Sequence, residues 1–195
     1  MLGIAVPSGD EVKTGFMLCL LNLVARLNLL GVKYKVLSAR RSDISMGRSS
    51  LVETALREEC DEILWLDSDM VFPGNVYEEL KETGHGIVGC TYRKRDGSGD
   101  LTHCEMPGST DESDIRIVGA LAGGCLLVRT EIYKALGTPY YGHSVMNTGQ
   151  IRGEDYTFCV RARKAGFETY LHLPLSKNIG HLAEQALFIE ESPSA

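Results

Sequence analysis

The order of apolar strands and amphipathic helices in the first 66 residues limits the possible fold more than any other feature of this sequence. Apolar side chains recur at three- and four-residue steps between Phe16 and Leu30, which predicts a helix with one buried face. The expected elements are, in order, a strand at 2–6, a helix at about 16–30, a strand at 33–37, a helix at 48–59 and a strand at 62–66. This order favours a doubly wound α/β fold, with a mostly parallel twisted sheet and helices on both faces.

The second part of the chain has weaker periodicity. We expect a helix at 76–82, a strand at 86–92, strands at 115–121 and 125–128, and a helix at 154–166, with a glycine- and acid-rich stretch at 95–114. No repeat or low-complexity linker separates the two parts, so we expect residues 1–195 to form a single compact domain.

Charge and cysteine usage disfavour several classes of protein. The 195 residues carry 26 acidic and 20 basic side chains, and a net charge of -6 disfavours a protein that grips a polyanion over a broad face. The six cysteines form no CxxC pair, which argues against a structural zinc site and favours reduced thiols in the cytoplasm. The longest apolar segment, 15–30, is interrupted by polar residues, so we expect neither a membrane span nor a secretory signal.

Two carboxylates follow the apolar run at 62–66, which is typical of a strand buried on both faces. Asp67 and Asp69 emerge at the carboxyl end of this strand, where open parallel sheets bind ligands. A bend would let both reach one divalent cation, which would relieve their mutual repulsion. Two other interpretations fit: Asp67 caps a helix and Asp69 forms a turn, or the segment is the nucleophile loop of a haloacid-dehalogenase-type phosphatase. The phosphatase also needs a later lysine and a paired-acid strand end, which the sequence does not locate.

Four segments together resemble the GT-A glycosyltransferases. Residues 63–70 resemble the family's Asp-x-Asp segment, Gly123 and Gly124 its glycine-rich element, 153–167 its acceptor-side helix with an x-Glu-Asp motif, and His181 its C-terminal metal ligand. The resemblance is to short bacterial and bacteriophage members similar to family 2. It implies a Rossmann-like GT-A fold, with a nucleotide-sugar-binding half at about 1–100, a smaller acceptor-side half at about 101–184 and a tail at 185–195.

The resemblance also implies an activity, that of a hexosyltransferase-type enzyme. Such an enzyme moves a sugar from a nucleotide diphosphate-sugar, here most simply a UDP-sugar, to an acceptor hydroxyl, with Mn²⁺ or Mg²⁺ as cofactor. Asp67, Asp69 and His181 would be the metal ligands, although a histidine after a glycine is also common in loops. Asp155 would be the general base of an inverting displacement, with Glu154 as the alternative. A first-turn acid stabilised by the helix dipole explains the same pair.

The donor-binding residues that the resemblance implies come from several segments. They are Pro7, Ser8, Asp10, Arg48, Asp67, Ser68, Gly123 and Gly124. Simpler roles exist for most of them. A turn explains Pro7, Ser8 and Asp10 equally well. Arg48, at the start of the second helix, faces either the donor or solvent. The two glycines allow either close approach to a sugar or a tight bend.

The main alternative is a non-catalytic nucleotide-sugar-binding module, which would keep the carboxylate pair and lose the base. A nucleotidyltransferase would carry a glycine-rich loop with arginine and lysine, which 6–10 lacks. The sequence does not distinguish between a glycan, a small molecule and a modified DNA base as the acceptor. The basic run at 93–95 could contact a phosphate group locally. We expect the polar stretch 140–152 to be a flexible loop over the donor, and the protein to be cytoplasmic, in the host cytoplasm if phage-encoded.

Overall fold

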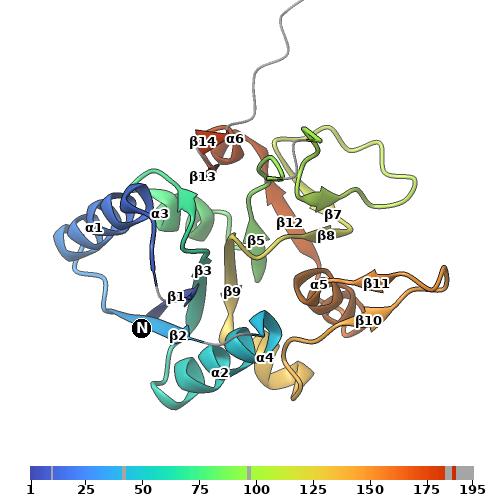
Figure 1. Ribbon diagram of the computed structural model, residues 1–195, viewed down its shortest axis with the longest axis horizontal. Helices are drawn as coiled ribbons and strands as arrows, with labels where there is room; N and C mark the ends of the chain where they lie inside the picture. The colour runs from blue at the N-terminus through green and yellow to red at the C-terminus, as the bar shows by residue number, and fades with distance from the viewer. Residues whose placement is uncertain (10, 41–42, 96–97, 183–185, 188–195) are drawn as a thin grey trace, which may run out of the picture.

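The computed structural model describes residues 1–9, 11–40, 43–95, 98–182 and 186–187. A seven-stranded sheet with the order β2-β1-β3-β9-β5-β12-β7 forms its centre (Figure 1). Its strands are β1 (Leu2–Ser8), β2 (Tyr34–Arg40), β3 (Glu62–Leu66), β5 (Ile87–Gly89), β7 (Ile115–Val118), β9 (Cys125–Arg129) and β12 (Thr169–His172). Five of them share one direction, while β9 and β7 run antiparallel to their neighbours. The mostly parallel α/β sheet expected from the sequence is therefore confirmed.

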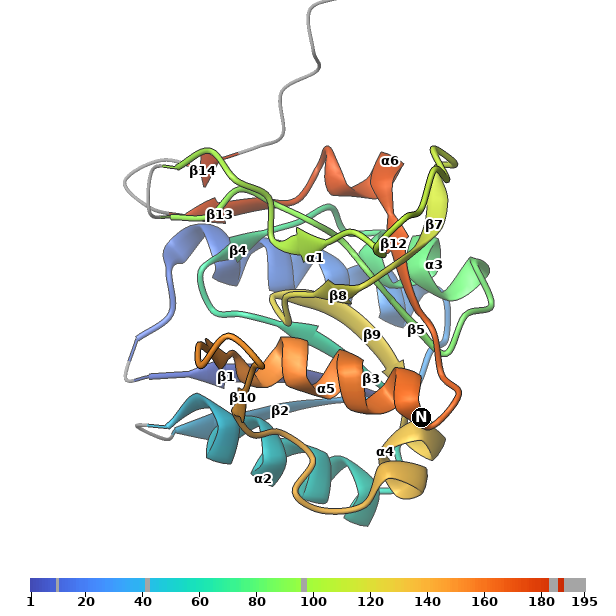
Figure 2. The same cartoon turned by 90° about the vertical axis from the view of Figure 1, so that its right-hand side faces the viewer.

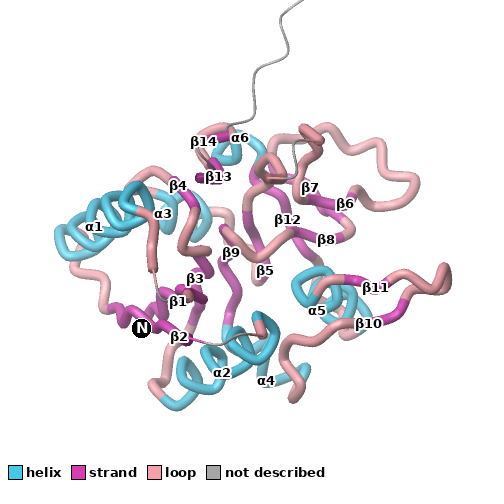
Figure 3. Tube along the Cα trace, in the orientation of Figure 1, coloured by secondary structure: helices cyan, strands magenta, loops and turns pink. Residues whose placement is uncertain are grey.

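Helices cover both faces of this sheet (Figure 3). They are α1 (Thr14–Leu29), α2 (Ile44–Arg57), α3 (Val76–Glu82), α4 (Thr130–Leu136), α5 (Glu154–Lys164) and the short α6 (Leu173–Ser176). The alternating side chains of β3 separate the two cores. Ile63 and Trp65 pack with α2, α4 and α5, whereas Leu64 and Leu66 pack with α1 and α3. All five residues of β3 are buried. The apolar run at 63–66 predicts this for four of them, and buried Glu62 accepts a hydrogen bond from the Tyr77 hydroxyl.

Short strand pairs complete the fold beside the sheet. These strands are β4 (Met70–Val71), β6 (His103–Cys104), β8 (Ala120–Leu121), β10 (Ser144–Val145), β11 (Ile151–Arg152), β13 (Gly180–Leu182) and β14 (Ala186–Leu187). β4 pairs with β13, β6 with β8, and β10 with β11. The β4–β13 pair lies above the carboxyl end of the sheet, and the β10–β11 hairpin lies beside α5 (Figure 2).

Several elements differ from the sequence-based expectation. β1 continues through Pro7 to Ser8 instead of stopping at Val6. Pro7 is tolerated because β1 pairs with β3 only as far as Ala5, so one edge of the strand needs no donor at that point. α2 begins at Ile44, where the Asp43 side chain accepts a hydrogen bond from the Met46 backbone N–H.

Other elements were not predicted at all. α4 and β12, a strand of the seven-stranded sheet, have no counterpart among the expected elements, and the expected strand at 115–121 is divided into β7 and β8. Residues 140–152, expected to form a flexible loop, contain the β10–β11 hairpin and a buried Tyr141. Among the described helices, none is both long and apolar enough to cross a membrane.

Candidate functional site

The segment after β3 turns back on itself at the carboxyl edge of the sheet. The Met70 N–H donates to the Asp67 carbonyl (3.0 Å), which closes a tight turn before β4. The Asp67 N–H donates to the Gly124 carbonyl (3.2 Å), so the turn is fastened to the loop that leads into β9. Ser68 uses its carbonyl to accept from the Lys13 N–H (3.3 Å). The bend that a shared cation would need is therefore present, although the two aspartates have different partners.

Asp69 and His181 face each other across the β4–β13 pair. His181 is opposite Met70 in the register, and the Leu182 N–H donates to the Asp69 carbonyl (2.7 Å). His181 Nε2 lies 3.9 Å from Asp69 Oδ1. His181 Nδ1 lies 2.9 Å from the Arg93 carbonyl. Because a carbonyl oxygen can only accept, Nδ1 carries the proton, and in the neutral ring the Nε2 lone pair remains available on the Asp69 side.

This donor set fits a divalent cation. One carboxylate and one imidazole whose second nitrogen is oriented by a backbone carbonyl are ordinary ligands for Mn²⁺. Within the described ranges, no group of three or more His, Cys, Asp or Glu side chains is assembled to hold a metal. In the structure, Arg95 Nη1 lies 2.5 Å from Asp69 Oδ2, and the Arg95 side chain is 55% exposed. A cation at Asp69 would therefore compete with a solvent-accessible guanidinium.

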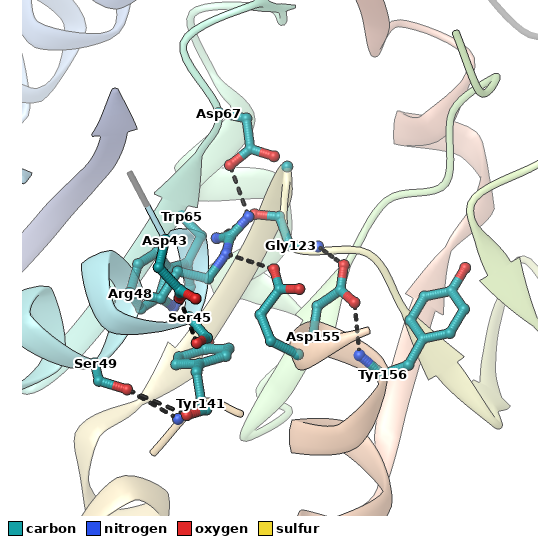
Figure 4. Close-up of polar contacts among 12 residues, drawn as sticks. Asp43, Ser45, Arg48, Ser49, Trp65, Asp67, Gly123, Tyr141, Asp155 and Tyr156 are labelled. Carbon is teal, nitrogen blue, oxygen red and sulfur yellow. Dashed lines mark hydrogen bonds and ion pairs between the residues drawn. The ribbon is translucent and has the colours of Figure 1, made fainter. Parts of the chain in front are cut away.

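Arg48 connects the two ends of the candidate site (Figure 4). Its guanidinium donates to Asp67 Oδ1 (2.8 Å), to Glu154 Oε1 (3.3 Å) and to the Gly123 carbonyl (3.3 Å). It also lies 5.3 Å from the centre of the Trp65 ring and 5.9 Å from that of Tyr141. Only 2% of Arg48 is exposed, so the expectation that it opens α2 and faces solvent or the donor phosphates needs revision. It sits in the second turn of the helix because α2 begins four residues earlier than expected.

Burial alone would lower the pKa of Arg48. The negative charges of Asp67 and Glu154 outweigh burial and hold the pKa of Arg48 above its ordinary value. Arg48 is therefore a permanent positive charge between the aspartate turn and the start of α5.

Glu154 and Asp155 occupy the first turn of α5, as the x-Glu-Asp pattern predicts. Glu154 turns inward to Arg48 and is 9% exposed. Asp155 accepts hydrogen bonds from the N–H groups of Gly123 (3.1 Å) and Tyr156 (2.7 Å). Burial and then the charge of Glu154 raise the pKa of Asp155 above its ordinary value, against the opposing effect of Arg48. The two acids thus have different surroundings, and Asp155 has the raised proton affinity expected of a general base.

The two glycines lie between these groups. A Cβ on Gly123 would come within 2.8 Å of the Arg48 guanidinium, and one on Gly124 would overlap the hydroxyl of Tyr92. The Tyr92 hydroxyl accepts a hydrogen bond from the Gly124 N–H (2.9 Å). Both glycines are therefore needed for the close approach of protein side chains. The contribution of Trp65, Tyr92 and Tyr141 to the site was not predicted. Trp65 stands in an apolar run, Tyr92 ends the expected strand at 86–92, and Tyr141 lies in the polar stretch that was expected to be a flexible loop.

The remaining donor-loop residues lie at the same edge of the sheet. Pro7 and Ser8 border a cavity of about 220 Å³ that is also lined by Asp43 and Gly47 at the start of α2. The Ser8 and Ser38 hydroxyls are 2.9 Å apart. Asp10 lies outside the described residues. The structure thus brings Pro7 and Ser8 to the end of β1, beside the strand that carries Asp67, because β1 and β3 are parallel.

Comparisons with known proteins agree on the fold. No protein-family model and no curated protein matches the sequence. Two solved structures superpose well: A197 from STIV (16% identity, TM-score 0.62, covering 100% of this chain and 96% of that one) and GalNAc-T7 with UDP, GalNAc and Mn²⁺ (13% identity, TM-score 0.63, covering 94% of this chain). This chain spans 44% of the GalNAc-T7 chain.

GalNAc-T7 is a GT-A glycosyltransferase, and its likeness to this chain extends over nearly the whole sheet and its helices. The chain therefore has a GT-A-like fold, as the four sequence segments indicated. At 13–16% identity this likeness establishes the fold alone.

Proposed function

We propose that this protein is a metal-dependent glycosyltransferase that moves a sugar from a nucleotide diphosphate-sugar to an acceptor hydroxyl. The observation that carries the proposal lies at the turn after β3 in a GT-A-like sheet. Asp69 of this turn lies beside His181, and Asp67 of the same turn is joined through the buried Arg48 to Gly123, which binds Asp155. GalNAc-T7 has this fold and was solved with UDP, GalNAc and Mn²⁺. That combination supports a nucleotide-sugar donor and a divalent cation for this chain also.

Asp69 and His181 are the proposed ligands of Mn²⁺ or Mg²⁺, which when bound would neutralise the charge that develops on the leaving diphosphate. Asp67 stays paired with Arg48, so we assign it an indirect role through water or the donor ribose. Arg95 is exposed and next to Asp69, and it supplies a positive charge where the diphosphate oxygens would lie.

Asp155 is the proposed general base of an inverting displacement. Hydrogen bonds from the Gly123 and Tyr156 N–H groups hold its carboxylate in place, and its raised pKa favours acceptance of the acceptor's hydroxyl proton. Glu154 is bound to Arg48, so we assign it to positioning and not to proton transfer.

The donor would lie along the carboxyl ends of β1 and β3. Pro7 and Ser8 border the small cavity in which we place the nucleoside, with uracil as the first base to test. Toward the acceptor side we place the donor against Ser68, Gly123 and Gly124, because Gly124 accepts from the Asp67 N–H and Gly123 binds Asp155. In this arrangement the donor half consists of residues of about 1–100, and the acceptor half of residues of about 101–184. We propose a hexose as the transferred sugar.

A donor-hydrolysis screen across nucleotide sugars, with and without Mn²⁺ or Mg²⁺, tests the proposal. We expect metal-dependent sugar release, loss of turnover in Asp155→Asn with nucleotide binding retained, and loss of metal dependence in Asp69→Asn. Asp111→Asn, an exposed acid bonded to Ser113, is the matched control. Nucleotide binding without any turnover would favour the non-catalytic module, and metal-independent hydrolysis of phosphomonoesters would favour the phosphatase.

A further inference from the structure

A cavity of about 700 Å³ lies between the β10–β11 hairpin and the outer face of α5, away from the site described above. Figures 1 and 2 show the hairpin beside this helix. Thr157, Val160 and Lys164 line it from α5, at the helical spacing of one face. Asp155 is on the opposite side of the helix, where it binds Gly123. The volume is in the range of sites that hold a small molecule.

The titratable residues around this cavity are all basic. His143, Arg152, Arg161 and Lys164 line it, and no Asp or Glu is among its described lining residues. This is notable in a chain of net charge -6. A concave surface that gathers one sign of charge raises the local concentration of ligands with the opposite charge.

Of the three arginine and lysine side chains in this lining, one is structural and two are available to a ligand. The Arg161 guanidinium donates to the carbonyls of Tyr140 (3.2 Å), Leu136 (3.2 Å) and Gly137 (3.3 Å), and so holds the wall of the cavity in place. Arg152 is half-buried in β11, and Lys164 is exposed at the end of α5. These two charges come from different elements and border one space.

The rest of the wall is partly apolar and firmly held. Val145, Met146 and Val160 contribute apolar surface. The Ser144 and Thr157 hydroxyls are 2.9 Å apart and fasten the hairpin to α5, so the cavity does not depend on the hairpin closing. An occupant would therefore meet both positive charge, from Arg152 and Lys164, and apolar surface, from Val145, Met146 and Val160.

We propose that this cavity is a binding site for a small amphipathic anion, with a phosphate or carboxylate group at Arg152 and Lys164 and an apolar group along Met146 and Val160. Charge complementarity and volume identify the chemical class. The site requires neither the nucleotide nor the metal of the proposed transferase, so the two proposals are tested separately.

Calorimetric titration with phenyl phosphate at low ionic strength, without nucleotide or metal, tests the site. We expect saturable one-to-one binding that is about tenfold weaker for uncharged phenol and weaker for inorganic phosphate, because each lacks one half of the ligand. Benzoate serves as the carboxylate arm, and whichever of the two aromatic anions binds more tightly identifies the preferred group.

Variants locate the binding. Lys164→Gln and Arg152→Gln should each weaken phenyl phosphate binding about five- to tenfold, the effect of losing one charged hydrogen-bond donor. Lys134→Gln, at an exposed position in α4 that borders a different cavity, should leave it unchanged. Lys164→Glu, at an exposed position at the end of α5, reverses the charge and gives a second, stronger test. Absence of saturable binding, or equal binding by all these variants, would overturn the proposal.

Discussion

Replacement of Arg48 by methionine tests how the two halves of the candidate site are held together. Arg48 is 2% exposed, and its guanidinium donates to Asp67, Glu154 and the Gly123 carbonyl. Methionine preserves much of the contact with Trp65 and Tyr141 but removes the charge and all three donors. Glu154, with a side chain only 12% exposed, would then keep a buried negative charge without its partner.

The expected cost is large for a single substitution. Removal of one member of a buried ion pair typically costs about 3–5 kcal/mol, because the other charge is left desolvated. In a domain of this size, about 1 kcal/mol lowers the melting temperature by about 2–4 °C, so we expect a fall of roughly 6–20 °C. The Asp67 side chain is 27% exposed and can be rehydrated, so most of the cost should come from Glu154.

Thermal unfolding followed by circular dichroism measures this effect, and a double-mutant cycle assigns it. If Glu154 carries the penalty, Arg48→Met combined with Glu154→Leu should cost at least about 1 kcal/mol less than the sum of the single variants. Arg57→Met, at an exposed position in the last turn of the same helix, should change the free energy of unfolding by no more than about 0.5 kcal/mol. Additive costs, or an Arg48→Met variant as stable as Arg57→Met, would refute the reasoning.

Three further predictions concern single groups in the site. In the pH profile of kcat/KM for donor hydrolysis, the midpoint of the acid limb should lie above the ordinary aspartate pKa of about 3.9. The raised pKa of Asp155 keeps this group protonated, and therefore inactive as a base, to a higher pH. A midpoint at or below that value would contradict the assignment of Asp155 as the base. Arg95→Gln should strengthen the binding of Mn²⁺ in the absence of nucleotide by about two- to fivefold, because the exposed guanidinium no longer competes for Asp69. Unchanged or weaker Mn²⁺ binding in calorimetry would argue against that competition. Gly124→Ala should lower the free energy of unfolding by about 1–3 kcal/mol through overlap with the Tyr92 hydroxyl, and Tyr92→Phe in the same chain should restore part of it; no loss in chemical denaturation would mean that the loop adapts.

The local features of the sequence predicted the frame of the site. The run at 62–66 predicted a buried strand with Asp67 and Asp69 at its carboxyl end, and the structure places them there. The acids of α5 were also placed correctly, because a first-turn acid pair before a helical pattern is a local signal. These predictions required only the periodicity of neighbouring residues.

The resemblance implied that Asp69 and His181 come together, but the pattern of neighbouring residues alone did not predict the long-range contacts of the site. The proximity of His181 to Asp69 depends on the β4–β13 pair, in which each strand is only two or three residues long. Arg48 was expected at a helix start, but its burial depends on Trp65, Tyr141 and Glu154, which come from three other parts of the chain. β12 was missed because Thr169–His172 is only four residues long and lacks the continuous apolar run that marks β3.

The central claim is that Asp69 and His181 bind a divalent cation together with a nucleotide diphosphate. Titration of UDP into the protein with and without Mn²⁺, repeated for Asp69→Asn and His181→Gln, tests it most directly. The account predicts Mn²⁺-dependent UDP binding that falls by about tenfold or more in both variants while Asp111→Asn binds normally. UDP binding that is equally tight without metal, or metal-dependent binding that survives both substitutions, would contradict it.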